Sequence, residues 1–406
     1  MRLSHRGALL TLDRVTLSVV TATRRAFIAS LGTALATRRI EQAFALQNLA
    51  PPSRGQLVRT MPLGRFDGRP APPMGTLLGT GLDARQFTDT STLTPETLIT
   101  ETQKFFVRTA ATAASSKPGR WAITLGGRVR RQAEISVEDL GPLARSMGTH
   151  LMECSGNADP ANFGLISAAR WSGVPVAAVL DRIQPLPGAS LVRVTGLDDD
   201  SRRWQSSVAG ANWIFSRGDL DKAGAFLATA MNEAPLTPDH GAPVRLVVPN
   251  WYGCVSIKWV TGLDLVSDDE PPTPQMREFA ARTHQNGARA RAREFQPTVI
   301  ELAAMPIRVE QWSVEGRLVY RVIGVRWGGS TPTRALTIRF KHTEAFVPVE
   351  DCPAPASTTT WSLWSHTWRP VQPGRYQIAL GVGDRSVPAR RLDLFYYTRD
   401  VQVDQI

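Results

Sequence analysis

The sequence at 150–157 is His150-Leu-Met-Glu-Cys154-Ser-Gly-Asn157, and the interpretation of the whole chain depends on it. Apolar and extended-favouring residues precede Cys154, and the small, turn-forming residues Ser-Gly-Asn follow it. This pattern predicts a strand that ends at a thiol. A cysteine in such a place can be a metal-binding thiolate, a nucleophile or an inert buried residue, so the rest of the sequence must decide between these roles.

Four further segments follow in a fixed order along the chain. They are Ala-Arg-Trp-Ser-Gly-Val-Pro at 169–175, Met-Asn-Glu-Ala-Pro-Leu at 231–236, Asp-His-Gly-Ala-Pro-Val-Arg-Leu-Val-Val-Pro at 239–249 and Ser-Ile-Lys-Trp at 256–259. With the cysteine segment, this series resembles the sulfite oxidase family of molybdenum-cofactor (molybdopterin) enzymes. The resemblance covers about residues 95–400, and ordered motifs at family-like spacing are more specific than any one of them.

The resemblance implies an α+β protein with two main domains. A mixed α/β molybdopterin-binding catalytic domain of sulfite oxidase type is expected at 94–300, followed at 301–406 by an immunoglobulin-like β-sandwich of the family's dimerisation type. Residues 46–93 are rich in Pro, Gly and Thr, which predicts an extended lead-in that covers the surface.

Local patterns predict the elements of these domains. Pro95 after Thr94 and Ser136 three residues before Asp139 are typical of helix starts. From about 304 onward, short β-type runs separated by turn residues favour a sandwich. The remaining expectations are a hairpin over 121–130, strands near 190–196, 244–249 and 256–266, and helices near 175–183 and 220–231.

Composition limits the class of protein. The 406 residues are enough for two cored domains, and 42% hydrophobic with 20% charged residues is typical of a soluble globular protein. Of the net charge of +11, the first 45 residues contribute +5, because they hold seven arginines against Asp13 and Glu41. The remaining basic residues are mostly scattered, without the clustered Lys/Arg and interleaved aromatic residues of a nucleic-acid surface, so no nucleic-acid partner is expected.

The N-terminal segment resembles a twin-arginine export signal over 1–45. Arg24 and Arg25 are followed by Phe27 and a modest apolar stretch, and Ala43-Phe-Ala45 fits a small-residue cleavage pattern. An amphipathic helix that happens to carry two arginines is the alternative. The signal predicts a periplasmic protein exported in the folded state, a route that suits a cofactor-loaded enzyme.

The resemblance assigns roles to the residues of the motifs. Cys154 becomes the molybdenum ligand, because a soft thiolate suits a metal that is already held by dithiolene sulfurs. The pterin and its phosphate require basic and hydrogen-bonding groups, since arginine grips phosphate with two hydrogen bonds and lysine binds it as a point charge. By residue type alone, Cys154 could also be a structural thiol, and each basic residue could be a solvated surface charge. The expected cofactor-binding residues are Asn157, His240, Arg245, Ser256 and Lys258.

The residues expected on the substrate side of the site match the family pattern at some positions and differ from it at others. Arg108 ends a Phe-Val-Arg segment like the family's, which makes it the candidate for orienting an anion, and Trp171 matches a tryptophan that lines the family's pocket, with core packing as the alternative. Trp213 is the best match for the family's active-site tyrosine. Asp159 stands where sulfite-oxidising members carry basic residues, and an acidic group there would repel a dianion.

These features predict a molybdopterin-dependent oxidoreductase that performs two-electron oxygen-atom transfer on a small sulfur compound or another oxyanion. A reductase of sulfoxides or other oxides with the same cofactor is the alternative, and a cofactor-free binding protein is a third. The sequence has no Cys-x-x-Cys-His haem motif, so a periplasmic cytochrome or another electron-transfer protein is the expected redox partner. The family resemblance also implies a homodimer.

Overall fold

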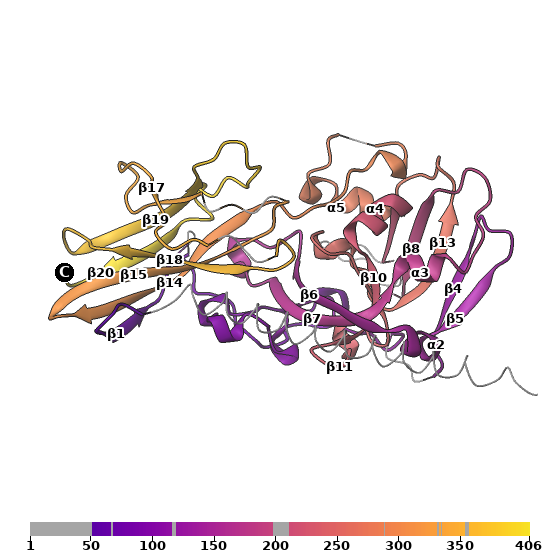
Figure 1. Cartoon of the computed structure of the whole chain (residues 1–406), viewed down its shortest axis with the longest axis horizontal. Helices are drawn as coiled ribbons and strands as arrows, with labels where there is room; N and C mark the ends of the chain where they lie inside the picture. The colour runs from indigo at the N-terminus through magenta and orange to yellow at the C-terminus, as the bar shows by residue number, and fades with distance from the viewer. Residues whose placement is uncertain are drawn as a thin grey trace, which may run out of the picture. The chain divides into compact units, whose positions relative to one another are not determined.

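The computed structural model describes residues 51–65, 68–115, 119–197, 211–287, 289–330, 333, 335–353 and 357–406 (Figure 1). The chain divides into two compact units, 1–47 and 48–406, and all described residues belong to the second. The expected signal at 1–45 lies outside the described residues and stays a prediction. In the described part of the chain, no helix is long and apolar enough to cross a membrane.

Two five-stranded sheets form the part of the molecule that contains Cys154. The first, an antiparallel sheet, has the order β11-β10-β7-β6, with β12 paired to β10. The second has the order β5-β4-β13-β8-β9, in which only the β4–β13 pair is parallel. The strands of the first sheet are β6 (Arg145–Glu153), β7 (Ile166–Pro175), β10 (Phe226–Met231), β11 (Ala234–Pro235) and β12 (Arg245–Val247). Those of the second are β4 (Ala122–Gly127), β5 (Ala133–Ser136), β8 (Leu191–Gly196), β9 (Asn212–Ser216) and β13 (Val260–Val266).

Alternation along the strands gives the first sheet two buried faces. Leu227 packs into a core shared with the second sheet, whereas its neighbours Phe226 and Ala228 pack into a second core on the other face. Short helices close the shared core and contribute buried side chains to it. They are α2 (Val137–Leu140), α3 (Val176–Leu180), α4 (Arg217–Ala223) and α5 (Pro274–Phe279).

Two four-stranded antiparallel sheets form the C-terminal part and share one large core. Their orders are β1-β14-β15-β18 and β17-β16-β19-β20. The first contains β1 (Gly55–Met61), β14 (Ala303–Val314), β15 (Arg317–Trp327) and β18 (Ser362–Trp368). The second contains β16 (Leu336–Arg339), β17 (Val347–Pro348), β19 (Gly374–Val382) and β20 (Arg399–Val403). The structure thus has two packed sheets where the sequence predicts a sandwich, while its immunoglobulin type stays a prediction.

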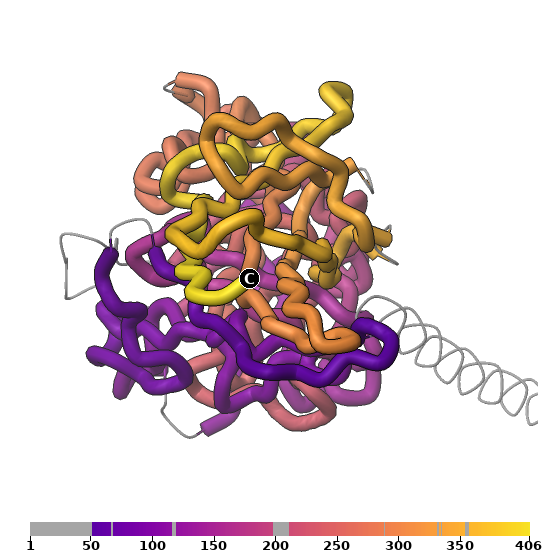
Figure 2. Tube along the Cα trace, turned by 90° about the vertical axis from the view of Figure 1, so that its left-hand side faces the viewer, coloured from indigo at the N-terminus to yellow at the C-terminus, as the bar shows by residue number. Residues whose placement is uncertain are grey.

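The N-terminal lead-in is more ordered than its composition predicts. Residues 55–61 form β1, which pairs with β14 about 250 positions later in the chain. Figure 2 shows this indigo segment running beside the orange strands of the C-terminal half. Farther along, β2 (Arg85–Gln86) pairs with β3 (Val107–Arg108). Backbone hydrogen bonds to distant strands, which composition does not encode, order this segment.

The local predictions meet with mixed success. The turn at Pro95–Thr97 has the capping box at Thr94, and α2 has the one at Ser136. The hairpin at 121–130 is wrong in its second strand, because β4 continues through Gly127 and pairs with β5 at 133–136. The helix at 220–231 is also wrong in its second half. Gly224 ends α4 in the left-handed region, and the apolar run 226–231 pairs as β10.

The pairing of β15 with β18 depends on one glycine. Gly324 lies opposite Trp364, and a Cβ on Gly324 would overlap the Trp364 ring. Gly324→Ala should therefore lower the free energy of unfolding by about 1–3 kcal/mol, because an added methyl group overpacks a dense core. Denaturant unfolding measures this. The control is Gly218→Ala in α4, where a Cβ meets nothing within 4 Å, and equal losses in both variants would contradict the packing argument.

Candidate active site

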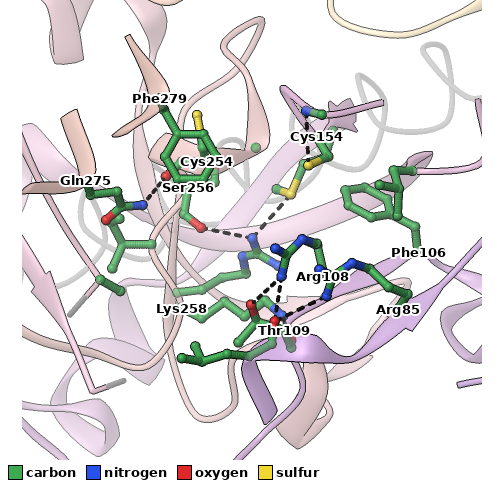
Figure 3. Close-up of a pocket in the computed structure, with 18 of the residues that line it drawn as sticks. Arg85, Phe106, Arg108, Thr109, Cys154, Cys254, Ser256, Lys258, Gln275 and Phe279 are labelled. Atoms are coloured by element: carbon green, nitrogen blue, oxygen red, sulfur yellow. Dashed lines mark hydrogen bonds between the residues drawn. The ribbon is translucent and has the colours of Figure 1, made fainter. Parts of the chain in front are cut away.

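A cavity of about 460 Å³ opens beside Cys154 (Figure 3). The turn after β6, the β2–β3 pair, the segment 253–259 and the end of α5 with the residues just beyond it all contribute to its lining. These segments are far apart in the sequence. The cavity therefore exists only when the first sheet, the lead-in and the 3-10 turn at Gly253–Val255 are packed together.

Cys154 follows the last residue of β6 and points into this cavity. Its backbone N–H donates to the Leu165 carbonyl at 2.9 Å, its carbonyl accepts from the Asn157 N–H at 2.9 Å, and its Sγ accepts from the Gly156 N–H at 3.4 Å. Burial raises the pKa of the Cys154 thiol, while the Gly156 N–H, Arg108 and Arg85 act in the opposite direction. Burial outweighs these groups, so the thiol is neutral by itself, and a bound metal ion would supply the charge that favours the thiolate.

A second cysteine, Cys254, lines the same cavity. Burial raises its pKa to about 12, so it is a neutral thiol. Arginines act on both thiols, because Arg108 and Arg85 lower the pKa of Cys154 and Arg282 lowers that of Cys254, but burial outweighs them in each case. The assignment of Cys154 as the metal ligand rests instead on its place in the sequence motif directly after β6.

Three arginines surround the space in front of the thiol. Arg85 and Arg108 are directly opposite each other on β2 and β3, and Arg282 comes from the turn at Ala281–Thr283. Burial first and Arg85 second lower the pKa of Arg108 to about 10, with Cys154 and Asp83 acting against this. Like charges that face each other across two strands are unfavourable by themselves. An anion bound between these arginines would relieve the repulsion.

Backbone carbonyls hold the first two arginines in place. Leu82 O accepts from Arg108 Nη1 at 2.6 Å and from Arg85 Nη1 at 3.1 Å. A Cβ on Gly156 would lie 3.9 Å from Cys154 Sγ and 4.0 Å from Arg282 Nη1, so glycine keeps the space between thiol and guanidinium open. The site therefore combines fixed positive charge with room for a small ligand.

Arg245 and Lys258 form a second positive wall of the cavity. Arg245 is 2% exposed, and it donates to the carbonyls of His240 at 3.2 Å and Ser256 at 3.0 Å, but its Nε has no partner. Lys258 Nζ donates to the carbonyls of Thr109 at 2.5 Å and Asp239 at 2.6 Å. Among the residues that the structure describes, Arg245 has no carboxylate within ion-pair distance, and burial lowers its pKa to about 9.

A buried guanidinium without a counter-ion is costly unless a ligand supplies the negative charge. The unpartnered Nε of Arg245 and the ammonium of Lys258 fit a phosphate, and Cys154 fits a soft metal. The residues present therefore match the donor set that molybdopterin requires.

Comparison with known proteins agrees with this chemistry. Residues 110–274 match the family model described as the oxidoreductase molybdopterin binding domain. Over this stretch the chain has a molybdopterin-binding oxidoreductase domain, and it is similar to sulfite oxidases. Its cofactor is accordingly molybdenum bound to molybdopterin.

Two groups of curated proteins are similar to this chain. Sulfite oxidase of Gallus gallus is 28% identical over 46% of this chain and 44% of its own length, and that of Rattus norvegicus is 26% identical over 64% and 55%. The catalytic subunit MsrP of the protein-methionine-sulfoxide reductase of Xanthomonas axonopodis is 30% identical over 38% of this chain and 47% of its own. The matches span about half the length of these relatives.

Among solved structures, the sulfane dehydrogenase SoxCD from Paracoccus pantotrophus has a similar fold. It superposes with a TM-score of 0.55 over 81% of this chain and 89% of that chain, at 15% sequence identity. This likeness concerns the fold alone.

The structure brings five of the predicted site residues together. Cys154 and Arg108 line the cavity on one side, and Arg245, Ser256 and Lys258 line it on another. Ser256 contributes its carbonyl to Arg245, and its Oγ accepts from the Val248 N–H at 3.3 Å. All five residues thus lie at the cavity, and their roles toward metal, cofactor and substrate stay predictions.

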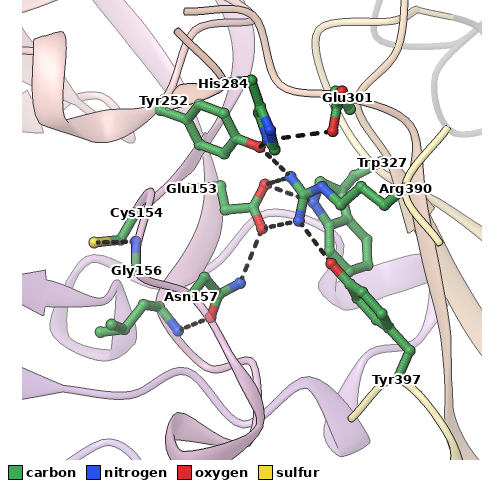
Figure 4. A network of polar contacts seen from close by, with 11 residues as sticks. Glu153, Cys154, Gly156, Asn157, Tyr252, His284, Glu301, Trp327, Arg390 and Tyr397 are labelled. Atoms are coloured by element: carbon green, nitrogen blue, oxygen red, sulfur yellow. Dashed lines mark hydrogen bonds and ion pairs between the residues drawn. The ribbon is translucent and has the colours of Figure 1, made fainter. Parts of the chain in front are cut away.

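Two expected cofactor-binding residues, His240 and Asn157, do not line the cavity, and their role at the cofactor stays a prediction. His240 packs edge-on against Phe105, accepts or donates at 2.6 Å to Thr237 Oγ1, and holds Arg245 through its carbonyl. Burial, then the charges of Lys258 and Arg245, lower its pKa to about 3, so it is neutral. Asn157 turns away from the cavity and caps the cysteine turn from the back (Figure 4).

The two expected pocket tryptophans do not line the cavity. Trp171 is 1% exposed, packs under Arg245 with the guanidinium carbon 5.6 Å from its ring centroid, and donates to the His150 carbonyl. Trp213 lies on β9 in the core between the two five-stranded sheets. The match of Trp213 to an active-site tyrosine is therefore wrong, because Trp213, Ile214 and Phe215 are all buried in that core and Trp213 does not line the cavity.

The expected repulsion of an anion by Asp159 is also wrong. Asp159 is 3% exposed, lies 3.1 Å from Arg399 Nη1 and 3.7 Å from Arg65 Nε, and does not line the cavity. Two arginines from the lead-in and the C-terminal strand β20 compensate its charge. The site is therefore more positive than the local sequence predicts.

Sequence reasoning missed Arg85, Arg282, Cys254 and Gln275, all of which line the cavity. Arg85 lies in a segment whose composition predicts only an extended lead-in. Arg282 lies in an arginine-bearing excursion that looks like a solvated face, and Arg291 and Arg293 of that excursion do pair with exposed Asp269. No spacing signal in the sequence separates Arg282 from its neighbours.

Replacing the second positive wall should release the cofactor. In Arg245→Met with Lys258→Met, loss of one charge-assisted contact costs roughly 1.5–3 kcal/mol, about tenfold or more in affinity. Pterin content per chain after gel filtration should therefore fall sharply. The control is Lys222→Met, an exposed lysine in the last turn of α4. Full pterin content in the double variant would remove both residues from the cofactor site.

Proposed function

We propose that the protein oxidises a small anionic sulfur compound, of the sulfite or sulfane type, by two-electron oxygen-atom transfer at its molybdopterin centre. The observation that carries this proposal is the group of three arginines, Arg85, Arg108 and Arg282, around the space in front of Cys154. Relatives named sulfite oxidase support the same substrate class.

Charge decides between oxidation of an anion and reduction of a neutral oxide. A neutral sulfoxide would bring no negative charge to the guanidinium groups of Arg85 and Arg108, which lie opposite each other on β2 and β3 and repel each other. A sulfur oxyanion supplies acceptor oxygens for planar, bidentate donors. Reduction of sulfoxides is the second candidate, because a relative is a methionine-sulfoxide reductase subunit.

Each residue of the cavity then has a defined task. When bound, molybdenum supplies a centre that exchanges two electrons and one oxygen atom. Cys154 provides a thiolate for the metal, and Arg245 with Lys258 binds the cofactor's phosphate. Arg85, Arg108 and Arg282 orient the substrate anion, and the carbonyl of Leu82 keeps two of them in place.

The setting of the enzyme follows from the same proposal. We propose that residues 1–45 direct twin-arginine export to the periplasm and that electrons pass to a periplasmic cytochrome or another electron-transfer protein. The C-terminal pair of sheets would be the immunoglobulin-like domain through which two copies form a homodimer. A cofactor-free binding protein is a poorer explanation, because Arg245 retains a buried charge that needs an anion.

A dye-linked assay of protein from a host that makes molybdopterin tests the direction and the substrate. Sulfite, thiosulfate and sulfane donors should reduce the dye, whereas methyl sulfoxides should not oxidise a reduced dye at a comparable rate. Faster turnover of neutral sulfoxides than of any anion would favour the reductase instead. A protein without molybdenum would contradict both.

Cys154→Ser should abolish turnover, because an alkoxide is a harder and poorer partner for molybdenum than a thiolate. The matched control is Cys352→Ala, which removes another buried thiol in the C-terminal part, away from the cavity. The control should keep most of its activity. Dye reduction with the best anionic donor measures both variants, and activity in the serine variant near the wild-type level would exclude Cys154 as the ligand.

Arg108→Gln should raise the Michaelis constant for the anionic donor about tenfold or more, because a charge-assisted contact of roughly 1.5–3 kcal/mol is lost. The effect should shrink at high salt, since screening weakens the wild-type attraction as well. Arg277→Gln, which changes an exposed arginine of α5, serves as the control. Equal Michaelis constants for wild type and Arg108→Gln at low salt would contradict the assignment.

A further inference from the structure

Glu153 and Cys154 are neighbours in the chain, but their side chains point to opposite faces of the backbone. Successive side chains of an extended strand point to opposite faces. Cys154 lines the cavity, whereas Glu153 has 0% exposure and lies in a polar network behind it (Figure 4). A fully buried carboxylate directly next to the proposed metal ligand requires an explanation.

Arg390 neutralises this carboxylate from the C-terminal part of the chain. Its Nη1 donates to Glu153 Oε1 at 2.9 Å, and its Nη2 donates to Glu153 Oε2 at 2.6 Å. Trp327, the last residue of β15, donates its indole N–H to the same Oε2 at 2.8 Å. The carboxylate is therefore held by a bidentate pair with Arg390 and by a further hydrogen bond from Trp327, and both donors belong to the C-terminal part of the chain.

Arg390 is itself tightly constrained. Its backbone N–H donates to the Leu302 carbonyl at 2.9 Å, and its Nη2 donates to Tyr252 OH at 3.0 Å. The guanidinium carbon lies 5.5 Å from the Tyr252 ring centroid and 5.8 Å from that of Trp327. The position of this guanidinium is thus set by the packing of the C-terminal sheets.

The same carboxylate reaches forward to the cysteine turn. Glu153 Oε1 accepts from Asn157 Nδ2 at 3.2 Å, and Asn157 Oδ1 accepts from the Leu165 N–H at 3.0 Å. The two residues that flank the turn, 153 and 157, are therefore tied to each other. Cys154 lies between them, and its own N–H is bonded to the Leu165 carbonyl.

We infer that the Arg390–Glu153 pair is a positioning device for Cys154, which sets the place of its sulfur and balances the charge next to the metal. The inference rests on the proposed function, in which Cys154 is the ligand of molybdenum. Both partners act through Cys154 and touch neither substrate nor cofactor. Groups that orient a metal ligand from behind typically change metal affinity or activity 10- to 100-fold when they are replaced.

If the pair balances charge next to the metal, replacing one partner should shift the reduction potential of the metal, whereas a purely destabilising substitution should not. Arg390→Gln leaves a negative charge beside the thiolate, which favours the more oxidised metal and lowers its reduction potential. Glu153→Gln leaves a positive charge there and raises the potential. The double variant restores neutrality and should return the potential toward that of the wild type. Arg390→Lys keeps the charge without the fork, so its potential should stay near the wild-type value.

The experiment measures four properties of the purified holoenzyme: melting temperature, molybdenum per chain, the reduction potential of the metal and turnover. The matched control is Arg399→Gln, which breaks another buried ion pair between the C-terminal part and the region after Cys154, at 3.1 Å from Asp159. Turnover should fall roughly 10- to 100-fold in both single glutamine variants at positions 153 and 390. The control should lose thermal stability with its reduction potential unchanged.

Potential shifts of opposite sign in the two single variants, with recovery in the double variant, would support the inference. Potentials that stay at the wild-type value while melting temperatures fall as in Arg399→Gln would show a purely structural pair and overturn it. If Arg390→Gln does not accumulate as folded protein, Glu153→Gln and Arg390→Lys decide the question by the same comparison. A wild-type protein that lacks molybdenum would instead overturn the proposed function, and the wild-type metal analysis distinguishes that outcome.

Discussion

The buried ion pair between Glu153 and Arg390 is the interaction on which the arrangement of the site depends. A carboxylate with no solvent exposure is tolerated only when it is paired and fully hydrogen-bonded, and here Arg390, Trp327 and Asn157 supply those bonds. The pair joins the end of β6 to the segment before β20. It therefore fixes the position of the cysteine turn relative to the C-terminal sheets. The large core that extends from β14 and β15 to Leu151, Ile166 and Tyr252 has the same effect through apolar packing.

The cavity in front of this pair has the opposite electrostatic character. Its arginines are held by backbone carbonyls, which orient the guanidinium groups without neutralising them. Burial lowers the pKa of Arg108 to about 10 and that of Arg245 to about 9, which reflects charge kept in a place where water cannot fully solvate it. Such buried charge is favourable where an anionic ligand compensates it, and under the proposed function the two groups of basic residues would bind the phosphate of the cofactor and the substrate anion.

The contrast between the front and the back of β6 explains why one strand end can serve both purposes. Alternation sends a thiol to the positive cavity and a carboxylate to its own arginine, so the negative charge of Glu153 is compensated before it can oppose an incoming anion. Asp159 follows the same principle with Arg65 and Arg399. Glu153 and Asp159 are thus each paired with arginines outside the cavity lining.

Local patterns in the sequence predict the turn after β6, because a strand followed by Ser-Gly-Asn folds in this way whatever the rest of the chain does. Capping at Thr94 and Ser136 belongs with this turn, because a cap is decided within four residues. The α+β class and the basic residues Arg108, Arg245 and Lys258 came from the family resemblance, and all three residues line the cavity.

The tertiary structure alone decided which charges meet. Arg85 and Arg282 reach the cavity from segments with no distinctive local pattern, while Trp213 and Asp159 turn away from it because of the strands and arginines that pack against them. The partner of Glu153 lies 237 positions farther along the chain. Contacts between residues so far apart in the chain form only when complete sheets pack against each other. No local pattern in a single sequence predicts them.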